Sequence, residues 1–119
     1  MTLDEAQGLA ELELWDDAWQ ALDELPPEDQ LDPRVIRLRL ECAIGMERWN
    51  TVMELAGHLS RGDDQDRLAA AAGFRLLAVV AIQSRHIDTA KDLVARAIEA
   101  WPDSRRDMED DPELAEHVV

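Results

Sequence analysis

The chain has 119 residues, of which 46% are hydrophobic, and a formal net charge of −15. This length fits one small domain with a modest core, and the hydrophobic fraction excludes an intrinsically disordered chain. The negative charge disfavours nucleic acids and anionic membrane surfaces as partners, because both would be repelled. The sequence shows neither a signal-peptide pattern nor an apolar run of membrane-spanning length, so we expect a cytoplasmic protein.

Two helices are predicted at the start of the chain. Thr2 and Glu5 have the spacing of a capping box, which opens the first helix. Asp16 and Asp17 lie in the first turn of the second helix, where the helix dipole favours negative charge. The proline pair at 26–27 ends this helix, because proline lacks the N–H group that a helix interior needs.

The third and fourth helices follow after a short loop. Asp32 is the expected N-cap and Pro33 the first residue of the third helix, which ends near Gly45. The fourth helix is expected over residues 49–59. Cys42, the single cysteine, lies in an apolar stretch of the third helix and is predicted to be a small core residue, not a nucleophile.

The second half of the chain predicts two further helices and a short terminal one. Residues 60–64 are the longest turn-like stretch and the only candidate internal hinge. One helix is expected over 67–84 and the next over 87–100, followed by a polar, acidic segment at 103–111. Residues 111–118 predict a short helix capped by its first residue. One apolar face of the 67–84 helix is expected to consist of Leu68, Ala71, Phe74, Leu77, Ala78 and Ala81.

Three segments of the chain resemble one another. Trp15 and Trp49 stand 34 residues apart, and each begins a similar short amphipathic segment. A third copy begins at Ile87, 38 residues after Trp49. Self-similarity at such a period is typical of stacked helical repeats, and no strand pattern occurs. The chain is therefore predicted to be all-α, an antiparallel array of helix pairs.

These copies resemble the tetratricopeptide repeat (TPR) family, whose motif is a helix–turn–helix of about 34 residues. The third copy matches best, with the small residues Ala78 and Ala90 where its two helices meet. The family's positions in this copy are held by Phe74, Leu77, Ala78, Ala81, Ala90, Val94, Ala97 and Pro102. The second copy departs from the pattern at Arg39 and Val52, where the family has leucine and alanine.

The resemblance implies three antiparallel helix pairs stacked as a short right-handed superhelix, with a short C-terminal capping helix. The whole chain, residues 1–119, is then one TPR-like domain. Its repeats cover about residues 2–27, 33–61 and 67–102, and the cap covers about 103–119. Trp15 and Trp49 take the family position of an aromatic plug at the helix turn. Trp19 either faces the next helix pair or is partly exposed.

In TPR proteins the first helix of each pair lines a concave face that usually binds the ligand. The partner-binding groove that the resemblance implies consists of Gln7, Glu11, Arg34, Arg37, Glu41, Ile44, Arg75, Val79 and Ile82. Its three arginines form a positive patch suited to a carboxylate or phosphate on a partner peptide. In the alternative interpretation they are solvated, or paired inside the protein with Glu41 and Glu11.

The sequence carries no pattern of a catalytic or metal site. His58, His86 and His117 have no second ligand at helical spacing. The acidic clusters at 63–66 and 109–111 lack the alternating ligands and central glycine of a calcium loop. We therefore expect no enzymatic activity, no metal and no cofactor.

The predicted function is that of a protein–protein interaction adaptor, which binds a partner protein or peptide in the groove. Two alternatives stay open. In the first, the module self-associates as a homodimer through the surface around Val94, Ile98 and Trp101, if the C-terminal segment leaves it uncovered. In the second, the acidic module escorts a basic client in the manner of a chaperone.

Overall fold

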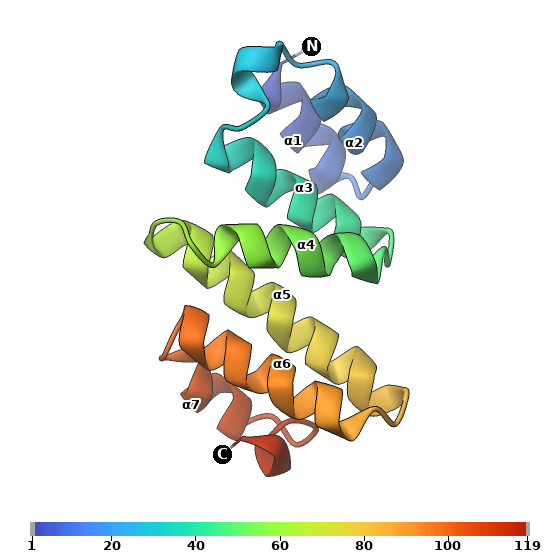
Figure 1. Ribbon diagram of the computed structural model, residues 1–119. Coiled ribbons are helices and arrows are strands. Elements are labelled where there is room, and N and C mark those ends of the chain that lie inside the picture. The colour runs from blue at the N-terminus through green and yellow to red at the C-terminus, as the bar shows by residue number, and fades with distance from the viewer. Residues whose placement is uncertain (1, 119) are drawn as a thin grey trace. The chain divides into compact units, whose positions relative to one another are not determined.

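The computed structural model describes residues 2–118, which are built from helices and turns with no strand in this range (Figure 1). The α-helices are α1 (Leu3–Glu11), α2 (Trp15–Asp23), α3 (Pro33–Gly45), α4 (Trp49–Leu59), α5 (Asp64–Gln83), α6 (Ile87–Ala100) and α7 (Ser104–Glu109). Two short 3-10 helices accompany them, η1 (Pro27–Asp29) and η2 (Ala115–His117). The prediction of an all-α chain is confirmed.

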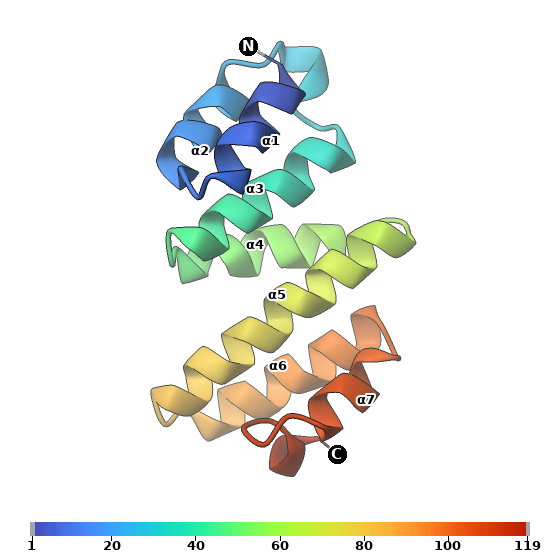
Figure 2. The ribbon, with the colours of Figure 1, turned by 180° about the vertical axis from the view of Figure 1, so that it is seen from behind.

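The chain divides into two compact units, and the boundary lies inside α4, between Leu55 and Ala56. The first unit contains α1, α2, η1, α3 and the start of α4, whereas the second contains the end of α4, α5, α6, α7 and η2 (Figure 2). Each unit has buried apolar residues of its own. The boundary between the two units therefore lies before the turn at 60–64, the segment predicted as a candidate hinge.

Two predicted helix starts in the first unit are confirmed by their capping hydrogen bonds. The Thr2 hydroxyl accepts a hydrogen bond from the Glu5 backbone N–H at 3.2 Å. The Asp32 carboxylate accepts one from the Arg34 backbone N–H at 2.9 Å, and Pro33 is the first residue of α3. Each bond satisfies an N–H group that has no partner within its own helix.

The start of α5 differs from the prediction. The helix begins at Asp64 and not at Arg67, because the Asp63 carboxylate caps it by accepting the Asp66 backbone N–H at 2.9 Å. The expected inward position of Leu68 is wrong, since this residue is 52% exposed. The other five residues of the predicted face, Ala71, Phe74, Leu77, Ala78 and Ala81, are buried. The buried face also includes Asp66 and Ala70, and Leu68 lies two residues, or roughly 200° around the helix, from each.

The corners that join α1 to α2, α3 to α4 and α5 to α6 share one backbone geometry. In each, a residue other than glycine has a positive φ: Glu13 (61°), Glu47 (56°) and Arg85 (64°). Its N–H donates to the carbonyl three residues back, and the following N–H donates to the carbonyl five residues back. These donor–acceptor pairs are Glu13–Ala10 and Leu14–Leu9, Glu47–Ile44 and Arg48–Ala43, and Arg85–Ile82 and His86–Ala81. This is the Schellman motif, so the repeat in the sequence is accompanied by a repeat of the backbone.

The core of the first unit is rich in small side chains where its helices meet. Its buried residues are Ala6, Ala10, Ala18, Ala21, Leu22, Leu25, Val35, Leu38 and Cys42. Alanine at such contacts lets helices pack at close distance. Cys42 is fully buried, which confirms its predicted role, and this burial raises the pKa of its thiol to about 11.

Arg39, the departure from the family pattern in the second copy, holds α2 and α3 together. Its guanidinium carbon lies 4.7 Å from the centre of the Trp19 ring. One of its terminal nitrogens, Nη2, lies 2.9 Å from Asp23 Oδ1 and donates to Gln30 Oε1 at 2.8 Å. The Gln30 side-chain NH₂ in turn donates to the carbonyls of Leu22 and Leu25. Trp19 is therefore partly buried, with Arg39 over its ring.

The second unit is organised around the contact between α5 and α6. Phe74, Leu77 and Ala78 of α5 are buried, as predicted. From α6 the buried residues are Ala90, Leu93, Val94, Ala97 and Ala100. The bounds of α6 and of α4 agree with the predicted ranges of 87–100 and 49–59.

The C-terminal segment corrects two predictions. Residues 103–111, expected as a polar segment, contain α7, in which Met108 is fully buried and Ser104 donates to the Trp101 carbonyl at 2.6 Å. The helix expected over 111–118 is only the 3-10 turn η2, because the chain buries Leu114 and His117, which are three residues apart. Both α7 and η2 contact α6.

Candidate binding site

The predicted groove residues are distributed over both units. Gln7 and Glu11 lie on α1, and four others lie on the neighbouring helix α3 of the same unit, namely Arg34, Arg37, Glu41 and Ile44. Arg75, Val79 and Ile82 lie on α5 in the second unit. The structure therefore brings the α1 and α3 members onto adjacent helices of one unit. The groove as a whole stays a prediction.

Arg34 and Arg75 of the predicted positive patch pair with aspartates inside the protein. The Arg34 guanidinium donates to both carboxylate oxygens of Asp32, at 2.7 and 3.2 Å. These hydrogen bonds, followed by the one from the Arg34 backbone N–H, lower the pKa of Asp32 to about 2. Arg75 Nη2 lies 3.6 Å from Asp111 Oδ2. Their partners are these aspartates and not the glutamates that the sequence suggested.

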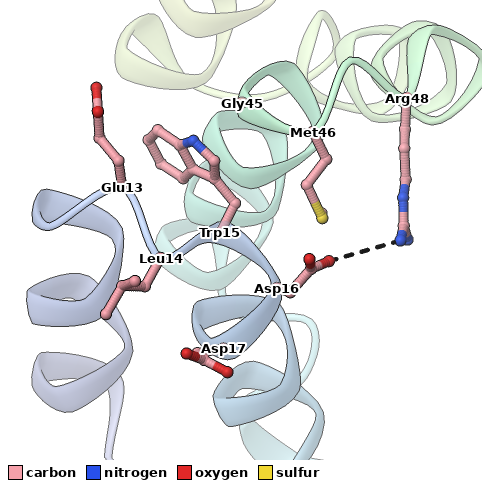
Figure 3. A pocket seen from close by; sticks show the side chains of 8 residues that line it. All are labelled: Glu13, Leu14, Trp15, Asp16, Asp17, Gly45, Met46 and Arg48. Atoms are coloured by element: carbon pink, nitrogen blue, oxygen red, sulfur yellow. Dashed lines mark ion pairs between the residues drawn. The ribbon is translucent and has the colours of Figure 1, made fainter.

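An open cavity of about 550 Å³ lies in the first unit, where two of the equivalent corners meet (Figure 3). We call it the Trp15 pocket. The α1–α2 corner supplies Glu13, Leu14, Trp15, Asp16 and Asp17, and the α3–α4 corner supplies Gly45, Met46 and Arg48. Its volume lies within the range of about 300–1,000 Å³ that is usual for ligand pockets.

Gly45 explains how the Trp15 ring comes to line this pocket. A Cβ atom added at Gly45 would overlap the Trp15 indole ring, so only glycine lets the ring lie against the end of α3. Trp15 is partly buried and packs against the core of the first unit. The ring thus serves the packing that the TPR resemblance implies, and it also forms part of a cavity wall, which that resemblance does not imply.

The polar groups of the Trp15 pocket are mainly acidic. Glu13, Asp16 and Asp17 line it together with a single cation, Arg48. Of the three carboxylates, that of Asp16 points toward Arg48, whose Nη2 lies 3.7 Å from Asp16 Oδ1 (Figure 3). The side chains of this pair are 55% and 86% exposed, so the contact contributes at most about 1 kcal/mol and is easily exchanged. The 44% exposed Leu14 adds apolar surface beside them.

This arrangement can hold a cation with an apolar stem. The face of a tryptophan ring attracts ammonium and guanidinium groups, and carboxylates pair with them directly. Sequence reasoning explained Trp15 by packing and Asp16 and Asp17 by the helix dipole, and it therefore missed the pocket. The available signal was the clustering of three acidic residues immediately around a tryptophan at a helix corner.

The residues 2–118 contain no helix that is both long and apolar enough to cross a membrane. Within the same range, no three His, Cys, Asp or Glu side chains are grouped so as to hold a metal ion. Comparison with protein-family models, with curated proteins and with solved structures finds no match. The assignment to the TPR family stays a prediction.

Proposed function

We propose that the protein is a non-enzymatic adaptor with TPR-like helix pairs, and that its first unit binds a basic segment of a partner protein at the Trp15 pocket. The observation that supports this function is a cavity lined by the partly exposed Trp15 and by three carboxylates, with Arg48 as a loosely held counter-ion. The formal charge of −15 adds a long-range attraction that speeds the encounter with a basic partner.

Arginine is the partner side chain that fits the pocket best. Its planar guanidinium stacks on an indole ring while its N–H edge pairs with carboxylates, which a lysine ammonium does less well. A cation over a tryptophan ring contributes about 0.5–2 kcal/mol, depending on how far it is removed from water. Asp16 and Asp17 line the same cavity as the ring and would supply charge-assisted hydrogen bonds to the guanidinium.

A titration with the peptide acetyl-Gly-Arg-Gly-Arg-Gly-amide tests the proposal. The indole N–H signal of Trp15 in a ¹⁵N NMR spectrum should shift, and the double variant Asp16→Asn/Asp17→Asn should bind at least about tenfold more weakly, the effect of losing about 1.4 kcal/mol. The matched control is Asp88→Asn/Asp92→Asn on α6, which removes the same charge from exposed positions. If both double variants weaken binding of the peptide equally, the effect comes from the net charge of the protein, and the Trp15 pocket is not the binding site.

Arg48 provides a second test because it competes with the proposed ligand for Asp16. Arg48→Gln should strengthen binding of the arginine peptide by a factor of about two to five, in line with the small energy of an exposed ion pair. If the same variant weakens binding of this peptide, Arg48 supports the peptide and does not compete with it for Asp16, which contradicts the proposed arrangement.

Specific contacts favour the Trp15 pocket as the docking surface over two other surfaces, the predicted groove and the surface around Val94. On the predicted groove, Arg34 is already engaged by Asp32, so less of its charge is available to a partner. Self-association would use the surface around Val94, Ile98 and Trp101. Val94 is only 1% exposed and α7 and η2 both contact α6, so the partly exposed Ile98 and Trp101 are what remains of this surface. If the double variant Arg37→Glu/Arg75→Glu reduces peptide capture and the Asp16/Asp17 variant does not, the groove is the docking surface.

A further inference from the structure

The second unit contains a cavity of about 410 Å³ that three arginines share. It lies among the end of α4, the turn that follows, α5 and α6. We call it the arginine cleft, and its lining consists of Gly57, Ser60, Arg61, Arg67, Phe74, Arg96, Glu99 and Ala100. The whole chain has only 12 lysine and arginine residues against 27 acidic ones, so three arginines in one cleft stand out against an acidic protein.

Two of these arginines are held in place by aromatic rings. The guanidinium carbon of Arg96 lies 5.4 Å from the centre of the buried Phe74 ring. That of Arg67 lies 5.7 Å from the centre of the Trp101 ring, and Arg67 also pairs with Asp64. Stacking on a ring fixes the position of each of these guanidinium groups before an anion arrives.

The third arginine is exposed. Within residues 2–118, no ion pair or side-chain hydrogen bond is formed by Arg61. Glu99 is the one acidic residue among those that line the cleft. The lining therefore contains three guanidinium groups against one carboxylate, and an anion placed there would meet an excess of positive charge.

We propose that the arginine cleft binds a phosphate monoester. A phosphate monoester carries nearly two negative charges and three acceptor oxygens at neutral pH, and guanidinium groups bind such oxygens in pairs. A carboxylate offers one charge and two oxygens to the same three arginines. A nucleic acid is disfavoured because the protein as a whole repels a polyanion. The site is separate from the Trp15 pocket and does not depend on the function proposed for it.

Calorimetric titration of the full chain at pH 7.5 tests the proposal with three probes. These are inorganic phosphate, the peptide acetyl-Gly-phosphoserine-Gly-amide, and the same peptide with glutamate in place of phosphoserine. Both phosphate probes should bind with a one-to-one stoichiometry. Tighter binding of the phosphopeptide identifies a phosphorylated protein as the source of the group, whereas equal binding identifies a free phosphate compound. Equal or tighter binding of the glutamate peptide, or no saturable binding of phosphate, overturns the proposal.

Variants then locate the binding site. Arg61→Gln and Arg96→Gln should each weaken phosphate binding about ten- to a hundredfold, the range expected for losing hydrogen bonds to a charged group. Arg61→Lys keeps the charge but loses the paired donors, so it should give a smaller loss. The matched control is Arg106→Gln at an exposed position of α7, which should bind like the wild type. Equal losses in Arg61→Gln and Arg106→Gln would mean unspecific attraction and would refute the site, with melting curves showing that each variant is folded.

Discussion

Replacing Arg39 by leucine, the residue of the TPR pattern, tests whether a polar network stabilises the contact between α2 and α3. The Arg39 side chain is only 12% exposed. Its hydrogen bond to Gln30 is charge-assisted and contributes about 1.5–3 kcal/mol. The stacking on Trp19 contributes about 0.5–2 kcal/mol. The ion pair with Asp23 contributes less, about 0.2–1 kcal/mol, because the Asp23 side chain is 56% exposed.

A leucine at position 39 recovers part of this loss through apolar contact, on the order of 1–2 kcal/mol. We therefore expect Arg39→Leu to reduce the free energy of unfolding by about 2 kcal/mol, and Arg39→Ala by about 3 kcal/mol. The Gln30 amide explains why leucine does not compensate fully. It holds two carbonyls at the end of α2, and without Arg39 its own oxygen loses a partner.

Urea unfolding followed by tryptophan fluorescence measures these free energies. A double-mutant cycle of Arg39→Leu with Gln30→Ala should give a coupling energy above about 1 kcal/mol, and a cycle with Asp23→Asn a smaller one. The reasoning is refuted if Arg39→Leu stabilises the protein, as happens when a buried ionic group is replaced by a well-packed apolar one. It is also refuted if the coupling with Asp23 exceeds that with Gln30.

Three further changes have outcomes whose sign follows from the structure. Arg85→Gly should raise the free energy of unfolding by about 0.5–1 kcal/mol, because glycine adopts the positive φ without strain although it loses more chain entropy. The pKa of Asp32, about 2 in the folded protein, lies below its ordinary value of 3.8, so its contribution to stability is present above pH 3.8 and is lost as the pH falls through 2. A ¹³C titration should show this pKa, and Arg34→Gln should return it towards 3.8. Gly45→Ala should destabilise the protein by about 1–3 kcal/mol and shift the Trp15 indole signal, because the added methyl overlaps the ring.

The predictions for Arg85 and Gly45 each have a matched control. Lys91→Gly, at an exposed position inside α6, should destabilise the protein by about 0.5–1 kcal/mol, and an equal effect of Arg85→Gly would contradict the role of its positive φ. Gly8→Ala and Gly57→Ala place a methyl in open space within a helix and should stabilise by about 0.5–1 kcal/mol. If Gly45→Ala behaves like them, the Trp15 ring does not depend on Gly45.

The sequence determined the helices themselves, because their signals are local. Capping side chains act on N–H groups two or three residues away, as Thr2 and Asp32 do, so the chain around them is enough to place a helix start. The start of α5, predicted at Arg67, also depends on a local signal. The Asp63 carboxylate caps the helix about one turn earlier, so α5 begins at Asp64. The missed α7 had a weaker signal, because its buried residues Ser104 and Met108 stand among charged neighbours.

The candidate sites were decided by the tertiary structure alone. The Trp15 pocket needs two corners that are far apart in the sequence, and no local pattern shows that the Trp15 ring would meet Gly45 or that Arg48 would face Asp16. The arginine cleft likewise collects side chains from a turn, α5 and α6. A helix pattern is set by neighbours within one turn, whereas a binding site is set by which helix faces meet in space. The sequence therefore predicts the all-α chain and its repeated corners, and the packing of these corners decides which charges converge.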